Sequence, residues 1–173
     1  MIVAVTGTPG TGKTSVAEEL AELLDYPYVS VTEVAQQDSV STERDAERDA
    51  EAVDMADLVA ALDEAVGEDA VLDGHLSHYY EANLAVVLRC QPDTLRERLE
   101  AKGWSEEKIE ENLDAERLDV VLQEAVRMNE EIVEIDTTEK DAEEVAELVQ
   151  RLVHHSSERE DHRPGSVAWE LPR

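Results

Sequence analysis

The residues with the clearest chemistry lie in Gly7–Thr14, whose sequence GTPGTGKT directly follows the apolar run Ile2–Val5. This is the P-loop pattern G-x-x-x-x-G-K-[ST], and its setting between a strand-like run and a helical segment fits as well. Its glycines let the backbone turn tightly and point N–H groups at phosphates, next to the positive end of the following helix. Lys13 can reach the β- and γ-phosphates, and the Thr14 hydroxyl is placed for Mg²⁺. The sequence predicts a nucleoside triphosphate site, and its glycines are Gly7, Gly10 and Gly12.

A second polar group follows the apolar segment Ala70–Leu72, in the sequence VLDGHLSH. Asp73 ends this expected strand, where a Walker B carboxylate would organise Mg²⁺ and its waters. Capping the next turn is its alternative role. His75 should face the same site, where it could position an attacking oxygen or stabilise charge on the γ-phosphate. A solvated loop histidine is an equal alternative.

Arginines elsewhere extend the predicted site. Arg89 closes the apolar segment Leu84–Leu88 on the nucleotide side of the expected sheet, and we interpret it as a phosphate contact. The partly polar stretch 30–53 carries Arg44 and Arg48, and a phosphate acceptor could be held there.

The segment Arg96–Glu111 has the pattern of a very short lid, because a glycine turn separates a helix end from a helix start. Such a lid would cover charges and exclude water during phosphoryl transfer. It carries Arg96, Arg98 and Lys102. For each of these cations an ion pair is the simpler interpretation, and Arg96 and Arg98 could pair with Glu97 and Glu100.

The apolar pattern predicts five short strands, Ile2–Val5, Tyr28–Val31, Ala70–Leu72, Leu84–Leu88 and Ile132–Ile135. Helical patterns cover Ser15–Leu24, Val31–Gln37, Ala52–Val66, Asp93–Ala101, Ser105–Arg127 and Asp141–Val153. The polar stretch Ser39–Ala50 lacks a hydrophobic stripe and is expected to lie on the surface and to be mobile. Alternating strands and helices predict an α/β fold, a five-stranded parallel sheet with helices on both faces. Residues 1–153 form this domain, and 154–173 form a polar tail that is either disordered or packed on the body.

The composition restricts the class of protein. A formal net charge of −28, spread over the whole chain, indicates adaptation to a salt-loving cytosol and argues against general nucleic-acid binding. Cys90 is the single cysteine, so no disulfide can form within the chain and a reducing compartment is expected. No apolar run approaches membrane-spanning length, and the first residues do not read as a signal peptide. These features predict a cytoplasmic protein.

Several of these segments together resemble the small adenylate kinases of the isoenzyme-6 type, which occur in archaea and eukaryotic nuclei. The resemblance covers residues 1–153 and rests on GTPGTGKTS, VLDGH, VVLR and RLEAKGWSEEKIEENLDAE. These sequences occupy Gly7–Ser15, Val71–His75, Val86–Arg89 and Arg98–Glu116. Together with the acidic composition, the resemblance indicates a halophilic archaeon and a P-loop NTPase fold.

The resemblance implies the reaction ATP + AMP = 2 ADP with Mg²⁺. It assigns Asp73 and His75 to metal organisation and catalysis, residues 30–53 to monophosphate binding, and Ala101–Glu111 to the lid. The residues it assigns to the ATP phosphates are Gly10, Gly12, Lys13, Thr14 and Ser15.

Two positions depart from the family pattern. Gln36 stands where relatives carry an arginine in the monophosphate region, so Arg44 or Arg48 would have to supply that grip. Lys102 stands at a lid position usually held by arginine, which keeps the charge but loses the bidentate fork.

The resemblance also implies ATPase activity during maturation of the small ribosomal subunit and its rRNA. The implied partners are a platform ribosomal protein and pre-ribosomal particles. An assembly ATPase with little kinase activity is therefore the alternative to a nucleoside-monophosphate kinase, and a P-loop kinase for another small acceptor is a third hypothesis.

Overall fold

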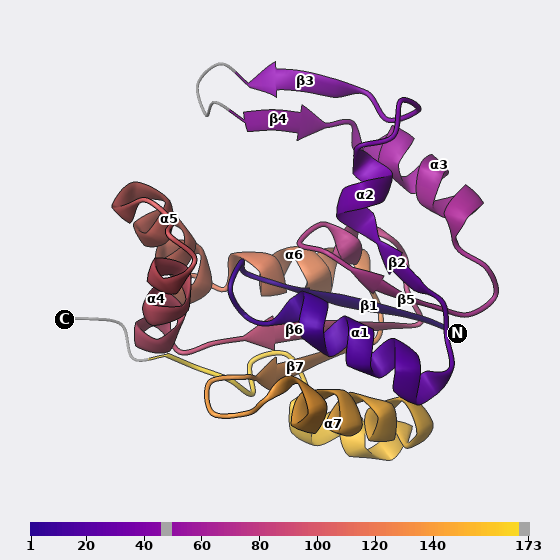
Figure 1. Cartoon of the computed structure of the whole chain (residues 1–173). Coiled ribbons are helices and arrows are strands. Elements are labelled where there is room, and N and C mark those ends of the chain that lie inside the picture. The colour runs from indigo at the N-terminus through magenta and orange to yellow at the C-terminus, as the bar shows by residue number, and fades with distance from the viewer. Residues whose placement is uncertain (46–49, 170–173) are drawn as a thin grey trace.

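The computed structural model describes residues 1–45 and 50–169, and the side chains of these residues outside 42–52. Five parallel strands form one sheet in the order β2-β5-β1-β6-β7 (Figure 1). Their bounds are β1 Ile2–Gly7, β2 Tyr28–Ser30, β5 Ala70–Asp73, β6 Leu84–Arg89 and β7 Ile132–Asp136. The predicted five-stranded parallel α/β sheet is confirmed, and every predicted strand is present with ends shifted by at most two residues.

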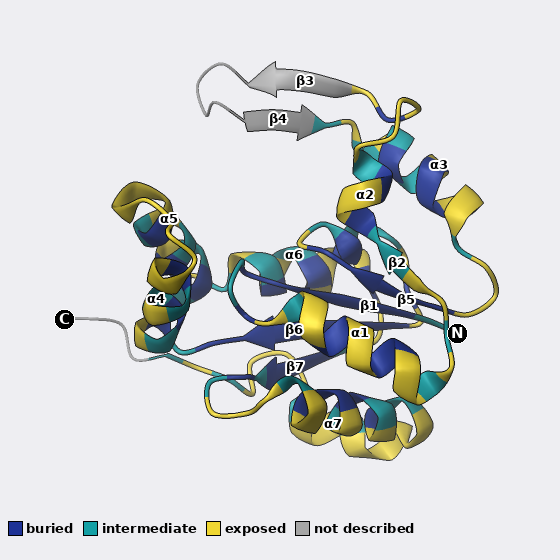
Figure 2. Ribbon diagram, in the orientation of Figure 1, coloured by how far each residue is buried: buried dark blue, intermediate teal, exposed yellow. Residues whose placement is uncertain are grey.

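Helices cover both faces of the sheet, as predicted. On one face α1 (Lys13–Leu24) and α7 (Ala142–His154) pack side by side, and α3 (Met55–Ala65) and α6 (Val120–Met128) lie on the other (Figure 1). Alternation along β1 separates the two cores, because Val3 and Val5 pack in the cluster of α1 and α7 whereas Ala4 packs with α3. Figure 2 shows the central strands buried along their length.

One arm projects from the sheet beyond β2, at the top of Figure 1. It contains α2 (Val31–Ala35), the antiparallel hairpin of β3 (Thr42–Asp45) and β4 (Ala50–Val53), and the start of α3. We call residues 31–57 the acceptor arm, after the monophosphate-binding role that the resemblance implies for residues 30–53. The strands β3 and β4 in this region were not predicted from the sequence. The surface position and mobility expected for Ser39–Ala50 stay predictions, and residues 46–49 lie outside the described part.

The hairpin also changes the start of the next helix. The predicted helix from Ala52 begins at Met55, because Ala52 and Val53 pair with β3. Asp54 then caps α3, and its side chain accepts hydrogen bonds from the backbone N–H groups of Ala56 (2.9 Å) and Asp57 (3.1 Å).

A second projection is the helical hairpin of α4 (Pro92–Ala101) and α5 (Glu106–Arg117), at the left of Figure 1. The single helix predicted over Ser105–Arg127 is wrong, since the chain breaks after Arg117 and resumes as α6 at Val120. Asp119 has φ of 55°, a left-handed conformation that interrupts the helix, and its carboxylate accepts a hydrogen bond from Arg89. A tertiary contact therefore favours the break.

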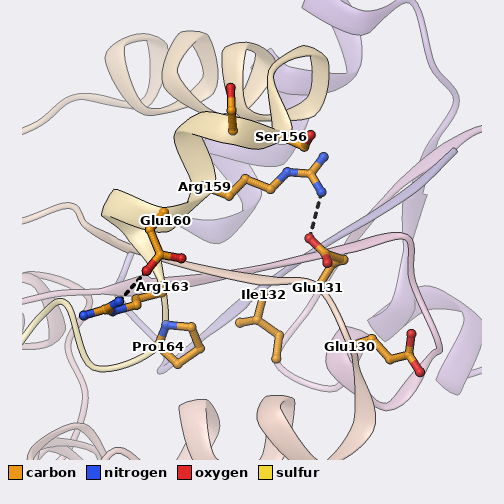
Figure 3. A pocket seen from close by; sticks show the side chains of 9 residues that line it. Glu130, Glu131, Ile132, Ser156, Arg159, Glu160, Arg163 and Pro164 are labelled. Carbon is orange, nitrogen blue, oxygen red and sulfur yellow. Dashed lines mark hydrogen bonds and ion pairs between the residues drawn. The ribbon is translucent and has the colours of Figure 1, made fainter.

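The C-terminal tail packs on the body up to Trp169. Of the two alternatives, disorder and packing, the structure therefore shows packing for this part. The 3₁₀ helix η2 (Ser156–His162) lies along β7, and Arg159 reaches Glu131 at 3.0 Å across a pocket of about 440 Å³ (Figure 3). Residues 170–173 lie outside the described part. Among the helices that the structure describes, none has both the length and the apolar character needed to cross a membrane.

Candidate active site

The P-loop joins the carboxyl end of β1 to α1, as predicted. Gly12 is the N-cap of α1 and has φ of 95°, which a residue with a side chain rarely adopts. Gly7 lies against the backbone of β6, and a Cβ there would clash with the carbonyl oxygen of Leu88. Close packing of the strand and the left-handed start of α1 both require glycine, so the pattern has a structural reason at each position.

Lys13 lies in the first turn of α1, and its ammonium donates a hydrogen bond to the carbonyl oxygen of Thr8 at 3.2 Å. Desolvation lowers the pKa of Lys13 to about 8, which the negative charge of Asp73 partly opposes. The Lys102 charge lowers this pKa further, and Glu116 raises it. Lys102, at the end of α4, is therefore close enough for its charge to act on Lys13.

Asp73 ends β5 beside the P-loop and is 6% exposed. Its Oδ2 accepts two hydrogen bonds of 2.8 Å, from the Thr14 and the Tyr28 hydroxyl groups. Its Oδ1 is buried and has no hydrogen-bond partner among the described residues. A buried carboxylate oxygen without a donor is costly unless a ligand completes it.

These residues fit a Mg²⁺ ion. The ion keeps several waters and usually takes only one or two protein ligands beside substrate phosphates. A free oxygen of Asp73 and the adjacent hydroxyl of Thr14 provide that number of ligands. Within the described ranges, no cluster of three or more histidine, cysteine or acidic side chains forms a protein-only metal cage.

His75 is exposed in the turn after β5, two residues beyond Asp73. Desolvation and then the charge of Lys13 lower its pKa, so the neutral imidazole is favoured. His78 is buried instead, and its Nδ1 lies 2.9 Å from the Thr6 hydroxyl. Burial lowers the pKa of His78 to about 4, which makes it a neutral part of the packing beneath β1.

Arg89 ends β6, but its guanidinium does not face an open phosphate site. It is 2% exposed and donates hydrogen bonds to Glu116 at 2.7 Å, to Asp119 at 2.6 Å and to Glu134. The predicted phosphate contact is not present in this structure, because three carboxylates already engage this side chain. It would require these ion pairs to rearrange.

The lid cations have different partners. Arg96 pairs with Glu106 at 2.8 Å and with Glu110, which ties α4 to α5. Of the glutamates that the ion-pair interpretation named, Glu100 lies 3.8 Å from Arg96. Arg98 instead donates to the carbonyl oxygens of Thr137 (2.8 Å) and Thr138 (3.3 Å), in the loop after β7. Neither arginine is free for a phosphate here. Lys102 is exposed.

On the acceptor arm, Gln36 is the C-cap residue of α2. The side chain of Arg44 and the whole of Arg48 lie outside the described residues, so their predicted contact with an acceptor is not described.

Sequence reasoning missed three residues that the fold brings to the P-loop. Tyr28, on β2, donates a hydrogen bond to Asp73. Glu116, on α5, accepts one of 2.5 Å from the Thr8 hydroxyl. The indole N–H of Trp169 lies 3.3 Å from Glu116. No local pattern marks them. One indirect signal is Arg89 at the end of an apolar strand, because a buried guanidinium requires carboxylate partners.

Known proteins are similar to this chain in sequence or in fold. A family model described as an AAA domain matches residues 3–119. A protein of Archaeoglobus fulgidus named "Putative adenylate kinase" is 45% identical over 171 residues, covering 98% of this chain and 92% of its own. A Methanosarcina barkeri protein of the same name is 38% identical over 178 residues, covering 98% and 97%.

The similarity to solved structures supports only the fold, since their sequence identity to this chain is low. Shikimate kinase from Acinetobacter baumannii has a TM-score of 0.63 at 17% identity, over 88% of this chain and 92% of that one. Deoxyadenosine kinase from M. mycoides has a TM-score of 0.59 at 18% identity, over 89% and 99%. The fold is therefore that of P-loop kinases.

Proposed function

The chain belongs to the archaeal family whose members are named adenylate kinases, and from this membership we propose that it transfers the γ-phosphate of ATP to AMP. The observation that carries the proposal is the meeting of Lys13, Thr14 and Asp73 at the P-loop. There Asp73 keeps one buried oxygen without a partner among the described residues. A phosphoryl-transfer enzyme needs such groups to neutralise and orient the phosphates.

Each residue has a proposed task. Thr14 and Asp73 would hold Mg²⁺, which supplies neutralisation of the charge that develops on the phosphates. The N–H groups from Gly7 to Ser15 cradle the phosphates, and the Lys13 ammonium stabilises negative charge on the transferring group. His75, neutral and two residues from Asp73, positions the acceptor oxygen.

We further propose that the acceptor arm binds the monophosphate and that residues 101–111 close over ATP, with Lys102 as the lid cation. The arm extends from β2, whose Tyr28 contacts Asp73, so an acceptor there lies next to the phosphate site. Because Gln36 replaces an arginine, Arg44 or Arg48 takes the contact with the acceptor phosphate.

The decisive experiment is ATP consumption with and without AMP in buffer with molar KCl and Mg²⁺, with ADP counted. We expect strong stimulation by AMP and two ADP for each ATP used. Other nucleoside monophosphates and shikimate serve as matched acceptors, and turnover faster with any of these than with AMP would contradict AMP as the substrate.

The family resemblance also supports a second hypothesis, an ATPase that acts in small-subunit assembly with a ribosomal protein. Slow phosphate release that is indifferent to AMP would favour this role over the kinase. Affinity capture in high salt should then recover small-subunit components, and their absence would count against it.

A further inference from the structure

The C-terminal tail completes a buried charged group beside the P-loop. We use the name Glu116 cluster for four charged residues and the tail residue that covers them: Arg89, Glu116, Asp119, Glu134 and Trp169. The Trp169 ring lies over the Arg89 guanidinium at 5.7 Å, and its indole N–H donates to Oε1 of Glu116 at 3.3 Å.

The backbone of the tail satisfies a second carboxylate. The N–H groups of Gly165 (2.8 Å) and Val167 (3.2 Å) both donate to Oε2 of Glu134, whose other oxygen accepts from Arg89. Glu116 and Glu134 are each 1% exposed. A buried carboxylate is stable only when hydrogen bonds fill its acceptor positions, so the tail provides what these two groups need.

Glu116 connects the tail to the P-loop through its hydrogen bonds. Its Oε2 accepts from the Thr8 hydroxyl at 2.5 Å, while Oε1 accepts from Arg89, from the Cys90 N–H and from Trp169. The carbonyl oxygen of Thr8 in turn accepts from the Lys13 ammonium at 3.2 Å. A continuous series of contacts therefore runs from the indole through Glu116 and Thr8 to the predicted phosphate-binding lysine.

The same carbonyl also organises the loop itself. Thr11 donates to it twice, from its N–H at 3.2 Å and from its hydroxyl at 2.8 Å. Thr8 and Thr11 are both at most 1% exposed, which leaves them little freedom to take other positions. A shift of Glu116 would move Thr8, and with it the atoms that shape the phosphate cradle.

We propose that Trp169 is a positioning residue of the nucleotide site. It fixes Glu116, which holds Thr8 and the P-loop in the form that binds triphosphate. The tail is thus part of the ATP site, although it lies more than 150 positions from the P-loop in the sequence. This inference rests on the proposed binding of ATP at the P-loop.

The test compares Trp169→Ala and Trp169→Phe with the wild-type chain, because phenylalanine keeps an aromatic face over Arg89 but lacks the N–H. We expect the KM for ATP to rise about five- to tenfold in the alanine variant and about two- to threefold in the phenylalanine variant. The KM for AMP and kcat should change by less than twofold, since none of the contacts described for the cluster involves a described residue of the acceptor arm. Ala168→Ser, at an exposed neighbouring position, is the matched control.

A spectroscopic measurement keeps the inference testable even if these variants fold poorly. The chain has two tryptophans, Trp104 and Trp169, so in a Trp104→Phe background Trp169 is the single reporter. Because Trp104 lies in the proposed lid, the Kd of this background for ATP is measured first and serves as the reference. Its emission should shift on titration with ATP and Mg²⁺, and AMP alone should leave it unchanged.

The outcomes are distinguishable. The positioning role is wrong if two results are found together. The first is that the wild type and folded Trp169→Ala bind ATP with the same Kd by calorimetry. The second is that the Trp169 emission in the Trp104→Phe background does not change with ATP. If the wild type binds no ATP, the proposed function fails and this inference with it. An equal rise in KM for both substrates would indicate general destabilisation and would also overturn the positioning role.

Discussion

Asp73 and Glu116 are buried carboxylates on the two sides of β1, and both contact the P-loop. Asp73, on the β5 side, accepts two hydroxyl groups on one oxygen and leaves the other without a partner among the described residues. Glu116, on the β6 side, accepts four hydrogen bonds shared between its two oxygens. The incomplete carboxylate is thus suited to a ligand, whereas the complete one holds the structure around it.

This difference separates two kinds of contribution from groups of the same chemistry. A buried group that lacks a partner destabilises the free protein and is retained where a ligand satisfies it. A group whose hydrogen bonds are all internal stabilises the fold and shapes the neighbouring loop. Lys13 lies between the two sides, because both carboxylates raise its pKa against the effect of burial.

The largest loss of ATP turnover is expected from a change of Lys13, which lies between Asp73 and Glu116. Lys13→Ala should lower ATP turnover by about 10²- to 10³-fold, because the charge that stabilises the transferring phosphoryl group is lost. Circular dichroism should show an intact fold. Arg151→Ala removes one exposed positive charge on α7 and is the control; a comparable loss there would mean that net charge alone explains the result.

Asp73→Asn tests the ligand side. We expect Mg²⁺-dependent turnover to fall about 100-fold, while the free energy of unfolding changes by less than about 1 kcal/mol, since the amide oxygen of asparagine can still accept from the Thr14 and Tyr28 hydroxyl groups. Calorimetry without Mg²⁺ should show ATP binding close to that of the wild type. Asp161→Asn, exposed in η2, is the control, and parallel loss of ATP binding and turnover in Asp73→Asn would contradict a metal role.

Glu116→Gln tests the structural side and should show the reverse order of effects. The free energy of unfolding, measured in urea, should fall by about 3 kcal/mol, because Arg89 and the Cys90 N–H lose a buried charged partner. Turnover at saturating ATP should fall much less than in Asp73→Asn. A stability equal to that of the wild type would remove the contrast between the two carboxylates.

The smallest effect concerns pH. The Lys13 pKa is lowered to about 8, so the free protein loses this positive charge as the pH rises through 8, and ATP binding should weaken toward tenfold per pH unit above it. Removing a nearby negative charge lowers this midpoint further, more in Asp73→Asn than in Glu116→Gln, because Asp73 has the larger influence. Calorimetric titrations between pH 7 and pH 9.5 would measure it, and equal midpoints in both variants would contradict this difference.

The sequence by itself determined the strands, the P-loop and the place of Asp73 at the end of β5. These depend on local rules, namely apolar runs of strand length, glycines with positive φ, and the ends of parallel strands at one edge of the sheet. Only the tertiary structure decided the partners of these groups. Thr8 and Glu116 are 108 residues apart, and Thr6 and His78 are 72 apart, so no neighbouring residue in the sequence encodes either contact.

The same reason explains the features in which the structure differs from, or goes beyond, the expectations from sequence. Arg89 was assigned from its place at a strand end, but three carboxylates from α5, the α5–α6 junction and β7 enclose it in the fold. The break at Asp119 and the packing of the tail up to Trp169 follow from this same cluster. A buried charge selects its partners in three dimensions, and this selection fixed features that periodicity along the chain leaves open.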